Sequence, residues 1–376
     1  MAHHVKATPI ETKDAEMAPE DRSLSQGALI WRSFRRHRLA MIGSVLLFIF
    51  YTVVIFSDFI APYAVNQRFS QYTLIAPQRI HIFGENGLQR PFVYGFERTR
   101  DPVTFQAVYT LDKDTTYPVE FFVRGHSYKL FGLFETDIHL FGSEQGPIFL
   151  FGTDELGRDM FSRIVLGARL SLTIGLVGVA ISLIIGLALG GISGFYGGII
   201  DDIVQRIIEF LMSIPSIPLW MALATALPRD WSIIQNYFAI TVILSVLGWT
   251  NLARVVRGKV ISLRDAEFVL AARTFGAKDW FLIVRHLIPN FTSYILVSVS
   301  LSIPNMILGE TSLSFLGLGL RPPAVSWGVL LQSASNVNVV AEHPWLLIPA
   351  AFVIVAVLAF NFVGDGLRDA ADPYSY

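Results

Sequence analysis

The sequence of 376 residues contains no cysteine, which excludes disulfide bonds, thiolate metal sites and cysteine nucleophiles. Charged residues are also scarce, at 16%, against about 25% in an ordinary soluble domain. The net charge of −1 gives no electrostatic reason to expect nucleic acid as a partner. The eight histidines are scattered, and no paired acids, Ser/His/Asp set or metal-ligand spacing stands out. We therefore expect no catalytic residue and no metal site.

Long apolar runs dominate what is present, with 53% hydrophobic residues and a mean hydropathy of +0.51. A helix needs about 20 apolar residues to cross a bilayer. Buried helices of a soluble protein are the alternative, but several uncharged runs of that length argue against it. We predict an all-α polytopic membrane protein with six transmembrane helices. They cover residues 39–57, 170–189, 203–226, 237–253, 291–308 and 345–362.

The distribution of basic residues predicts which side of the membrane each loop faces. Four arginines lie in WRSFRRHR before the first helix, and the loop 254–290 carries seven Lys/Arg against three acids. Short basic loops stay in the cytoplasm. We therefore expect a cytoplasmic N-terminal tail over residues 1–38, disordered to about residue 28, and a cytoplasmic C-terminus over 368–376. No cleavage site clearly follows the first apolar run, so we interpret it as a retained helix.

Residues 58–168 separate the first two helices and are too polar to enter lipid. The segments VTFQAVYT, VEFFVR and SYKLFG are rich in β-branched and aromatic residues, which is typical of short strands. A loop this long translocates regardless of its charge. We expect a small β-rich extracytoplasmic insert here, followed by a core of five helices over residues 169–367.

Three glycines at intervals of four predict a packing site on the second helix: Gly186, Gly190 and Gly194. Small residues at this spacing allow two helix backbones to approach closely. The partner helix could belong to this chain or to another subunit. The alternative is a loose glycine-rich exit turn, which certainly describes Gly197 and Gly198.

The third predicted helix carries charges and prolines within its apolar run. Arg206 and Glu209 are three residues apart and share a helix face, so they form either a structural ion pair or part of a substrate or ion site. Pro215 and Pro218 free backbone carbonyls and kink the helix, which suits a translocation path and also occurs in ordinary packing. We treat these four residues as translocation-path candidates.

The basic loop contains no nucleotide site. Its only Gly-Lys pair, Gly258-Lys259, lacks both the first glycine and the following Ser/Thr of a phosphate loop. We therefore expect no cofactor in this chain. The loop also carries several aromatic residues that are too apolar for water without a partner, such as Phe275 and Trp280, although an interfacial helix is an alternative. Ala271-Ala272, Gly276 and Pro289 have the spacing of a helix–turn–helix.

These last residues resemble the EAA loop of bacterial ABC importer permeases. Ala271, Ala272, Gly276 and Pro289 match its pattern, whereas Leu270, His286 and Ile288 depart from it. FGTDELGRDMFSRIVLGARLSL, DDIVQRIIEFLMSIPSIP, GETSLSFLGLGLRPP and GDGLRDAADP are similar to C-type subunits of the dipeptide, oligopeptide and nickel permeases. The resemblance covers most of the chain from Trp31 to Pro373, except for residues 66–146.

The resemblance implies a role and a set of partners in the bacterial inner membrane. A homologous permease subunit would form a heterodimer with this chain, two cytoplasmic ATPase subunits would bind ATP-Mg, and a binding protein would deliver substrate from outside. Peptides are the expected cargo, with nickel chelates, glutathione and oligosaccharides as alternatives. A stand-alone secondary transporter or channel is the competing class. The residues implied in ATPase coupling are Leu270, Ala271, Ala272, Gly276, Ala277, Trp280, Arg285 and Pro289.

The segment 66–146 is longer than expected for this family and is rich in aromatic residues. Such an exposed segment either folds on itself or covers a partner. We hypothesise a compact cap near the surface where the binding protein docks, and the alternative is a subdomain without a role in docking.

Overall fold

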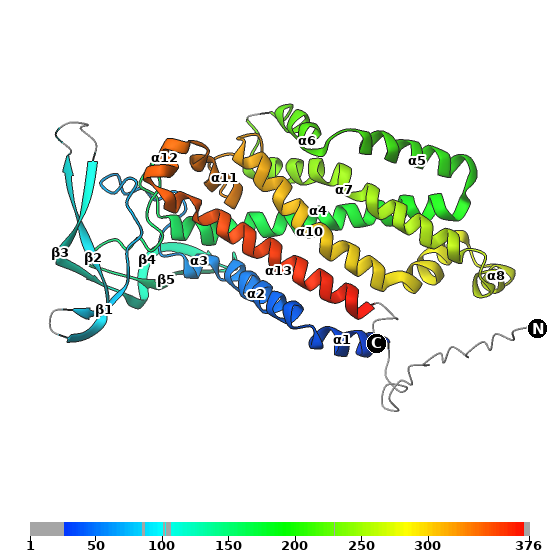
Figure 1. Cartoon of the computed structure of the whole chain (residues 1–376), viewed down its shortest axis with the longest axis horizontal. Coiled ribbons are helices and arrows are strands. Elements are labelled where there is room, and N and C mark those ends of the chain that lie inside the picture. The colour runs from blue at the N-terminus through cyan, green and yellow to red at the C-terminus, as the bar shows by residue number, and fades with distance from the viewer. Residues whose placement is uncertain (1–25, 85–86, 101, 103–106, 229, 372–376) are drawn as a thin grey trace, which may run out of the picture.

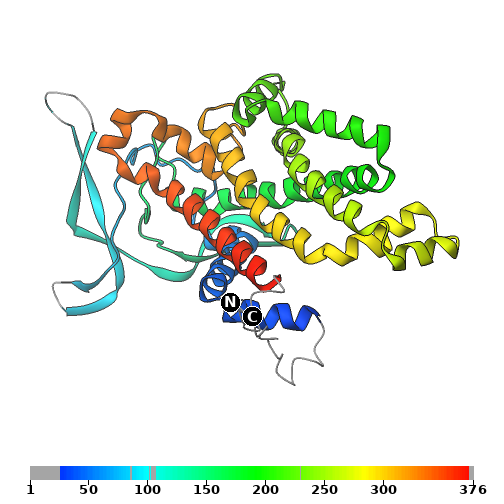
Figure 2. The same ribbon diagram turned by 45° about the vertical axis from the view of Figure 1, so that its right-hand side comes forward.

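A computed structural model describes residues 26–84, 87–100, 102, 107–228 and 230–371 of the chain. It consists of an elongated bundle of helices with β-strands at one end (Figure 1). The second view shows the same two parts, with the strands extending beyond the bundle (Figure 2).

Five helices among the described residues are long and apolar enough to cross a membrane. They are α2 (Arg38–Ile55), α4 (Met160–Tyr196), α7 (Ile233–Leu263), α10 (Thr292–Phe315, in an apolar stretch that begins at Asp279) and α13 (Ile348–Ala371). The predicted helix 203–226 is in fact two helices, α5 (Gly198–Ser213) and α6 (Ser216–Thr225), with an 88° bend between them. If the bent pair forms one span, the number of spans is the predicted six.

The bend has a local cause in the sequence. Pro215 lies directly before α6 with φ of −57° and ψ of 130°, outside the helical region. Proline has no N–H to donate and disfavours the helical conformation of the residue before it. Ile214, with ψ of 127°, accordingly ends α5.

The segment before the first span is more ordered than predicted. Residues 26–36 form a separate helix, α1 (Gln26–Arg36), where we expected a tail. His37 separates it from α2, and its Nδ1 accepts a hydrogen bond from the N–H of Ala40 at 3.1 Å, capping the new helix. Phe34 of α1 packs with Ala370 near the end of α13. Burial of this apolar contact explains why the segment is helical; residues 1–25 of the predicted tail lie outside the described residues.

The predicted β-rich insert is present as two antiparallel units. The first has the strand order β1 (His81–Gly84), β2 (Gly87–Arg100) and β3 (Ala107–Pro118). The second is a hairpin of β4 (Glu120–Leu130) and β5 (Phe134–Gly142), which contacts the short helix α3 (Ser57–Ile60) at the end of α2. Val93, Val119, Phe141 and Ile148 form a small core between the insert and the bundle.

The main core lies where α4, α7, α10 and α13 meet. The short helix α11 (Trp327–Leu331) enters this core after α10, and Trp327 is fully buried there. Its indole Nε1–H donates to the carbonyl of Ile164 at 3.0 Å, so the one polar atom of the side chain is satisfied. Next come a 3₁₀ turn (Gln332–Ser335), α12 (Val337–Glu342) and another 3₁₀ turn (Pro344–Leu347), which leads into α13.

The two ends of the bundle differ in what they carry. The insert and α12 lie at one end, and α8 (Glu267–Thr274) lies at the other (Figure 1). The loop predicted over 254–290 is shorter than expected, because α7 continues as a helix to Leu263.

Candidate functional site

The connection between α7 and α10 forms a small helical unit at the end of the bundle. It begins with α8 and turns at Gly276. It continues through α9 (Asp279–Phe281), a π-helical segment (Leu282–Leu287) and a 3₁₀ turn (Ile288–Phe291). The inner side of the unit packs with α7, and Val269, Leu282 and Leu287 are buried there. This apolar contact holds α8 against the end of α7.

The outer side of the same unit is apolar and exposed. Phe275 is 91% exposed and Trp280 is 64% exposed. Phe268, Leu270 and Phe281 are exposed beside them. Single exposed apolar residues are ordinary, but a group of large ones on one short unit indicates a surface that binds a partner. We call this group, consisting of Phe268, Leu270, Phe275, Trp280 and Phe281, the apolar end surface.

Gly276 makes the turn that brings the two halves of the unit together. Its φ is +81°, a conformation that residues with a Cβ rarely adopt, and a Cβ at this position would have no heavy atom within 4 Å. The Gly276 N–H donates to the Arg273 carbonyl and the Ala277 N–H to the Ala272 carbonyl. Glycine is therefore favoured here by the backbone conformation, and no contact within the chain excludes a Cβ.

The residues predicted to couple to an ATPase all lie in this unit. Leu270, Ala271, Trp280, Arg285 and Pro289 are exposed, whereas Ala272 and Ala277 are half-buried. One further residue of the unit, Arg273, was not among the predicted residues. Its guanidinium lies 5.2 Å from the ring centre of Phe195 at the end of α4. That contact joins α8 to a second span.

The three glycines of the predicted packing site line the contact between α4 and α7. A Cβ on Gly190 would lie 2.5 Å from the carbonyl oxygen of Ala253, and one on Gly194 would lie 2.8 Å from that of Arg257. A Cβ on Gly186 would meet the side chain of Leu252 at 2.9 Å. The partner helix therefore belongs to the same chain, and only residues without a side chain allow this approach.

The four translocation-path candidates lie on α5 and α6 and are not brought together. Arg206 Nη1 is 3.8 Å from Glu209 Oε2, and the Arg206 side chain is 85% exposed, so the pair is on the outer surface of this chain. Pro215 and Pro218 lie at and just after the bend between the two helices.

A pairing that the sequence reasoning missed joins the start of α5 to α7. The Arg257 guanidinium donates to both carboxylate oxygens of Asp201, and Ser193 Oγ of α4 donates to the same carboxylate. No spacing in the sequence connects Asp201 with Arg257, because the contact depends on how three helices pack.

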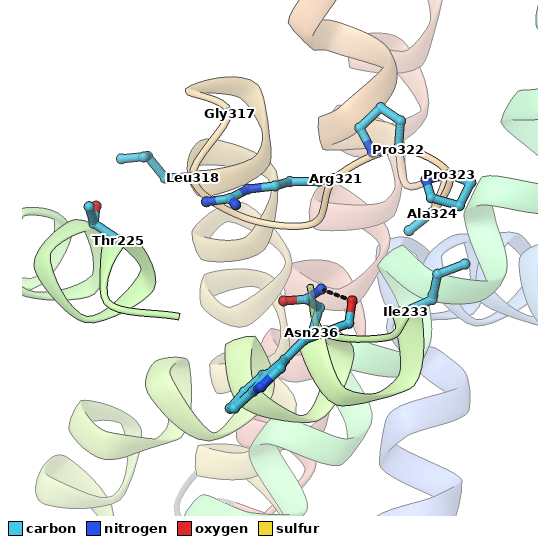
Figure 3. Close-up of a pocket in the computed structure, with 10 residues that line it drawn as sticks. Thr225, Ile233, Asn236, Gly317, Leu318, Arg321, Pro322, Pro323 and Ala324 are labelled. Atoms are coloured by element: carbon cyan, nitrogen blue, oxygen red, sulfur yellow. Dashed lines mark hydrogen bonds between the residues drawn. The ribbon is translucent and has the colours of Figure 1, made fainter. Parts of the chain in front are cut away.

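A cavity of about 530 Å³ was also missed, because its walls come from separate parts of the chain. It lies between the end of α6, the start of α7 and the loop that follows α10, at the end of α7 opposite α8. Arg321 extends across it, with Thr225 to one side and Asn236 on the wall beneath (Figure 3). The Asn236 amide is held by a hydrogen bond to the carbonyl of Trp231 at 3.1 Å. Among the described residues, the Arg321 guanidinium has no ion-pair partner, so the cavity presents a free positive charge.

Glu310 of α10 is fully buried. Its Oε1 accepts hydrogen bonds from Ser314 Oγ at 2.7 Å and from Ser326 Oγ at 2.6 Å. Ser326 also caps α11, where it accepts the N–H of Val329. Glu310 therefore ties α10 to α11.

The segment FGTDELGRDMFSRI folds into a charged turn at the start of α4. Asp154 accepts hydrogen bonds from Arg158 Nε at 2.7 Å and from Arg163, and all three side chains are largely buried. Asp159 caps α4 by accepting the N–H of Ser162 at 2.7 Å. Burial raises the pKa of the Asp159 carboxyl to about 7, an effect that the hydrogen bonds from Ser162 oppose.

Two models of known protein families match this sequence. Residues 182–374 match the model of the family described as binding-protein-dependent transport system inner membrane component. Residues 25–77 match the N-terminal TM domain of oligopeptide transport permease C.

Individual relatives agree with the family models. The oligopeptide transport system permease protein OppC of Bacillus subtilis is 42% identical over 224 residues, which is 59% of this chain and 71% of that protein. The dipeptide permease protein DppC of the same organism is also 42% identical, over 59% of this chain and 68% of that protein. DppC of Lactococcus lactis is 32% identical over 349 residues, covering 91% of this chain and 89% of that protein. The uncovered part is shorter than the segment 66–146, so this last alignment extends into the insert.

Proposed function

The chain belongs to the family of binding-protein-dependent transport system inner membrane components, and we propose that its transporter imports peptides. Peptide cargo is supported by the names of its relatives, which are oligopeptide and dipeptide permeases. We further propose that ATP is bound and hydrolysed by two separate cytoplasmic subunits, since this chain contains no phosphate loop. A homologous permease subunit and an extracytoplasmic binding protein complete the assembly.

The observation that carries this proposal is the apolar end surface. It projects from the end of the bundle on a unit that continues α7 and leads into α10. Within that unit, α8 also contacts α4 through Arg273 and Phe195. A partner that binds this unit and moves it displaces the spans with it. Because coupling requires different contacts in two states, the ATPase subunits would make different contacts with this surface in the presence and absence of ATP.

The same arrangement supports a proposed orientation in the membrane. The basic segment 254–290 lies at the end of the bundle opposite the insert, and α1 packs beside the end of α13 that points away from the insert (Figure 1). Basic loops are retained in the cytoplasm, so we place the apolar end surface and both termini inside and the insert outside. There the insert, over residues 66–146, would form the cap beside the binding protein.

The cavity around Arg321 is then at the outer end of the permease. A peptide released by the binding protein carries a C-terminal carboxylate, and a free guanidinium in a half-enclosed cavity is suited to bind it. We place this cavity at the entrance of the translocation path. The bend at Pro215 and Pro218 lies at the other end of α6, whose last turn lines the cavity, so we place α6 beside that path.

Reconstitution of the whole transporter tests the proposed function. Proteoliposomes that contain both permease subunits and both ATPase subunits should take up a labelled tripeptide when ATP and loaded binding protein are on their proper sides. Phe275→Ala should reduce uptake and ATPase co-purification, whereas Phe83→Ala, at an exposed aromatic residue of the insert, should leave ATPase co-purification unchanged. Uptake driven by a proton gradient without the ATPase subunits would instead identify a secondary transporter.

A further inference from the structure

The tip of the β4–β5 hairpin is apolar where a solvated turn is expected to be polar. Its sequence is Phe131-Gly132-Leu133-Phe134. Phe131 is 53% exposed, Leu133 is 77% exposed and Phe134 is 67% exposed. Turns in water are dominated by Gly, Asn, Asp and Ser. Three large apolar side chains at one exposed tip therefore indicate a surface that is covered in the working protein.

The backbone of this turn also disfavours an aromatic residue at its first position. Phe131 has φ of 55° and Gly132 has φ of 72°, two successive positive values for which Asn-Gly or Asp-Gly is the favoured pair. Phenylalanine at the first of these positions is strained, and asparagine would relieve the strain and be more soluble. The aromatic side chain therefore contributes something other than turn formation.

The tip lies where α2 ends. The rings of Phe131 and Phe56 are 5.6 Å apart, and further along the hairpin the rings of Phe122 and Phe59 are 6.2 Å apart. Figure 1 shows β5 beside α3, directly after α2. The apolar tip is thus at the level of the last turn of a helix that is long and apolar enough to cross the membrane.

The exposed face of α2 continues into this tip. Exposed apolar residues recur along the helix at helical spacing: Ile42, Val45, Phe48, Ile49, Ile55 and, just beyond it, Phe56. The buried side of α2 packs against α13, so this stripe is the side available to lipid. Because Phe131 contacts Phe56, the stripe and the tip form one continuous apolar surface.

Charged residues follow directly behind the tip. Lys129 and Glu135 face each other in the strand register one pair before the turn, and both are exposed. An apolar tip followed by a pair of charged side chains matches a segment that rests at the boundary between acyl chains and headgroups. The lysine side chain is long enough to reach lipid phosphates from this position.

We propose that the tip of the β4–β5 hairpin, residues 131–134, is embedded in the headgroup region of the leaflet that α2 reaches at Phe56. The occupant of the surface is lipid, because the surface is continuous with the lipid-accessible stripe of a membrane span. Such an anchor fixes the insert relative to the bilayer and limits its motion while the bundle changes shape. The inference requires that α2 spans the membrane, and it is independent of the transported substrate and of the ATPase partners.

Fluorophore depth measurements test this inference. Since the chain has no cysteine, Leu133→Cys provides a unique attachment site for an environment-sensitive fluorophore, and Lys113→Cys on β3 is the matched control in the other sheet. The full transporter is placed in nanodiscs of phosphatidylethanolamine and phosphatidylglycerol, some carrying a nitroxide near the headgroup. We expect the nitroxide to quench the label at 133 severalfold more than the label at 113, and aqueous iodide to show the opposite order. Phe134→Cys should behave like Leu133→Cys.

Two results would overturn the inference. Iodide quenching at 133 equal to that at 113, without quenching by the lipid nitroxide, would mean that the tip is in water. Protection of the label at 133 from both quenchers would mean that protein covers it, such as the second permease subunit.

Discussion

Asp201 at the start of α5 receives two hydrogen bonds from the guanidinium of Arg257 in α7, from Nε to Oδ1 and from Nη2 to Oδ2. Ser193 of α4 donates to the same carboxylate, so three helices meet at one side chain. Because the pair is partly buried and bidentate, it stabilises the fold more than an exposed ion pair would. It fixes the helices just beyond the Gly190 and Gly194 contacts, toward the end of the bundle that carries α8.

The contact between α4 and α7 predicts opposite effects for two glycine substitutions. Gly190→Ala would place a methyl group 2.5 Å from the Ala253 carbonyl oxygen, so the helices must separate. Overpacking of this kind costs about 1–3 kcal/mol. Gly258→Ala on α7 meets no atom within 4 Å and should be neutral or stabilising by up to about 1 kcal/mol, because alanine favours helix. Melting temperatures of the two variants in detergent measure the difference, and equal values would contradict the close packing.

Much of the bundle could be predicted because lipid imposes simple rules. Uncharged runs located the spans, and the spacing of Gly186, Gly190 and Gly194 indicated a close contact that lies within this chain. The turn at Gly276 could also be predicted, since glycine often supplies a positive φ at the end of a helix.

The remaining features depend on contacts between distant segments. The cavity around Arg321 joins α6, α7 and the loop after α10, and Glu310 is buried because Ser326 folds back onto it. Neither relationship leaves a periodic pattern in the sequence. The helix α1 was missed because its apolar side is short and becomes buried only when α13 packs against it.

Gly276 should tolerate asparagine better than valine. Its backbone requires a positive φ, which asparagine adopts at low cost and a β-branched residue adopts poorly. A side chain at this position meets nothing within the chain, so Gly276→Val should act through the backbone and lower ATP-driven peptide uptake more than Gly276→Asn. Uptake by the reconstituted transporter is the measurement. If both variants lost uptake equally, a clash with the docked ATPase would be the cause instead of backbone strain.

The raised pKa of Asp159 predicts that the folded protein becomes less stable as the pH rises toward neutral. Burial raises its pKa from the ordinary 3.8 to about 7, so the folded protein holds this proton more tightly than the unfolded chain does. The stabilising contribution is therefore complete below pH 3.8 and is lost as the pH rises through 7. At about 1.4 kcal/mol per pKa unit, the loss is on the order of 4–5 kcal/mol.

Asp159→Asn isolates this effect, since asparagine also caps helices but does not ionise. The melting temperature of the variant relative to the parent protein should increase between pH 4 and pH 8. A difference that is independent of pH would show that Asp159 does not titrate in this range.

Cysteine labelling tests the proposed orientation without background, because the chain contains no cysteine. Ser127 lies on β4 and Lys278 lies just after α8, and both are exposed. The elements β4 and α8 are at opposite ends of the molecule (Figure 1). In intact cells with a permeabilised outer membrane, Ser127→Cys should react with an impermeant thiol reagent and Lys278→Cys should not. Lysed cells should label both, and the reverse pattern in intact cells would overturn the assignment of sides.

Arg321 should contribute to the affinity for peptides through their C-terminal carboxylate. Its guanidinium extends into the cavity at the outer end of the bundle without a protein partner among the described residues (Figure 3). A hydrogen bond to a charged group contributes about 1.5–3 kcal/mol when buried and less in a half-open cavity. Arg321→Gln should therefore raise the KM for a free-acid tripeptide by roughly tenfold. The KM for the same peptide with an amidated C-terminus should hardly change.

Arg321→Lys is the matched control, because it keeps the charge and loses only the planar geometry of the guanidinium. It should fall between the parent protein and Arg321→Gln for the free acid, again with little change for the amide. A parallel loss for free acid and amide in Arg321→Gln would mean that the side chain maintains the shape of the cavity and does not bind the carboxylate. The ratio of the two KM values therefore distinguishes recognition from structure, even if the substitution lowers the total amount of folded transporter.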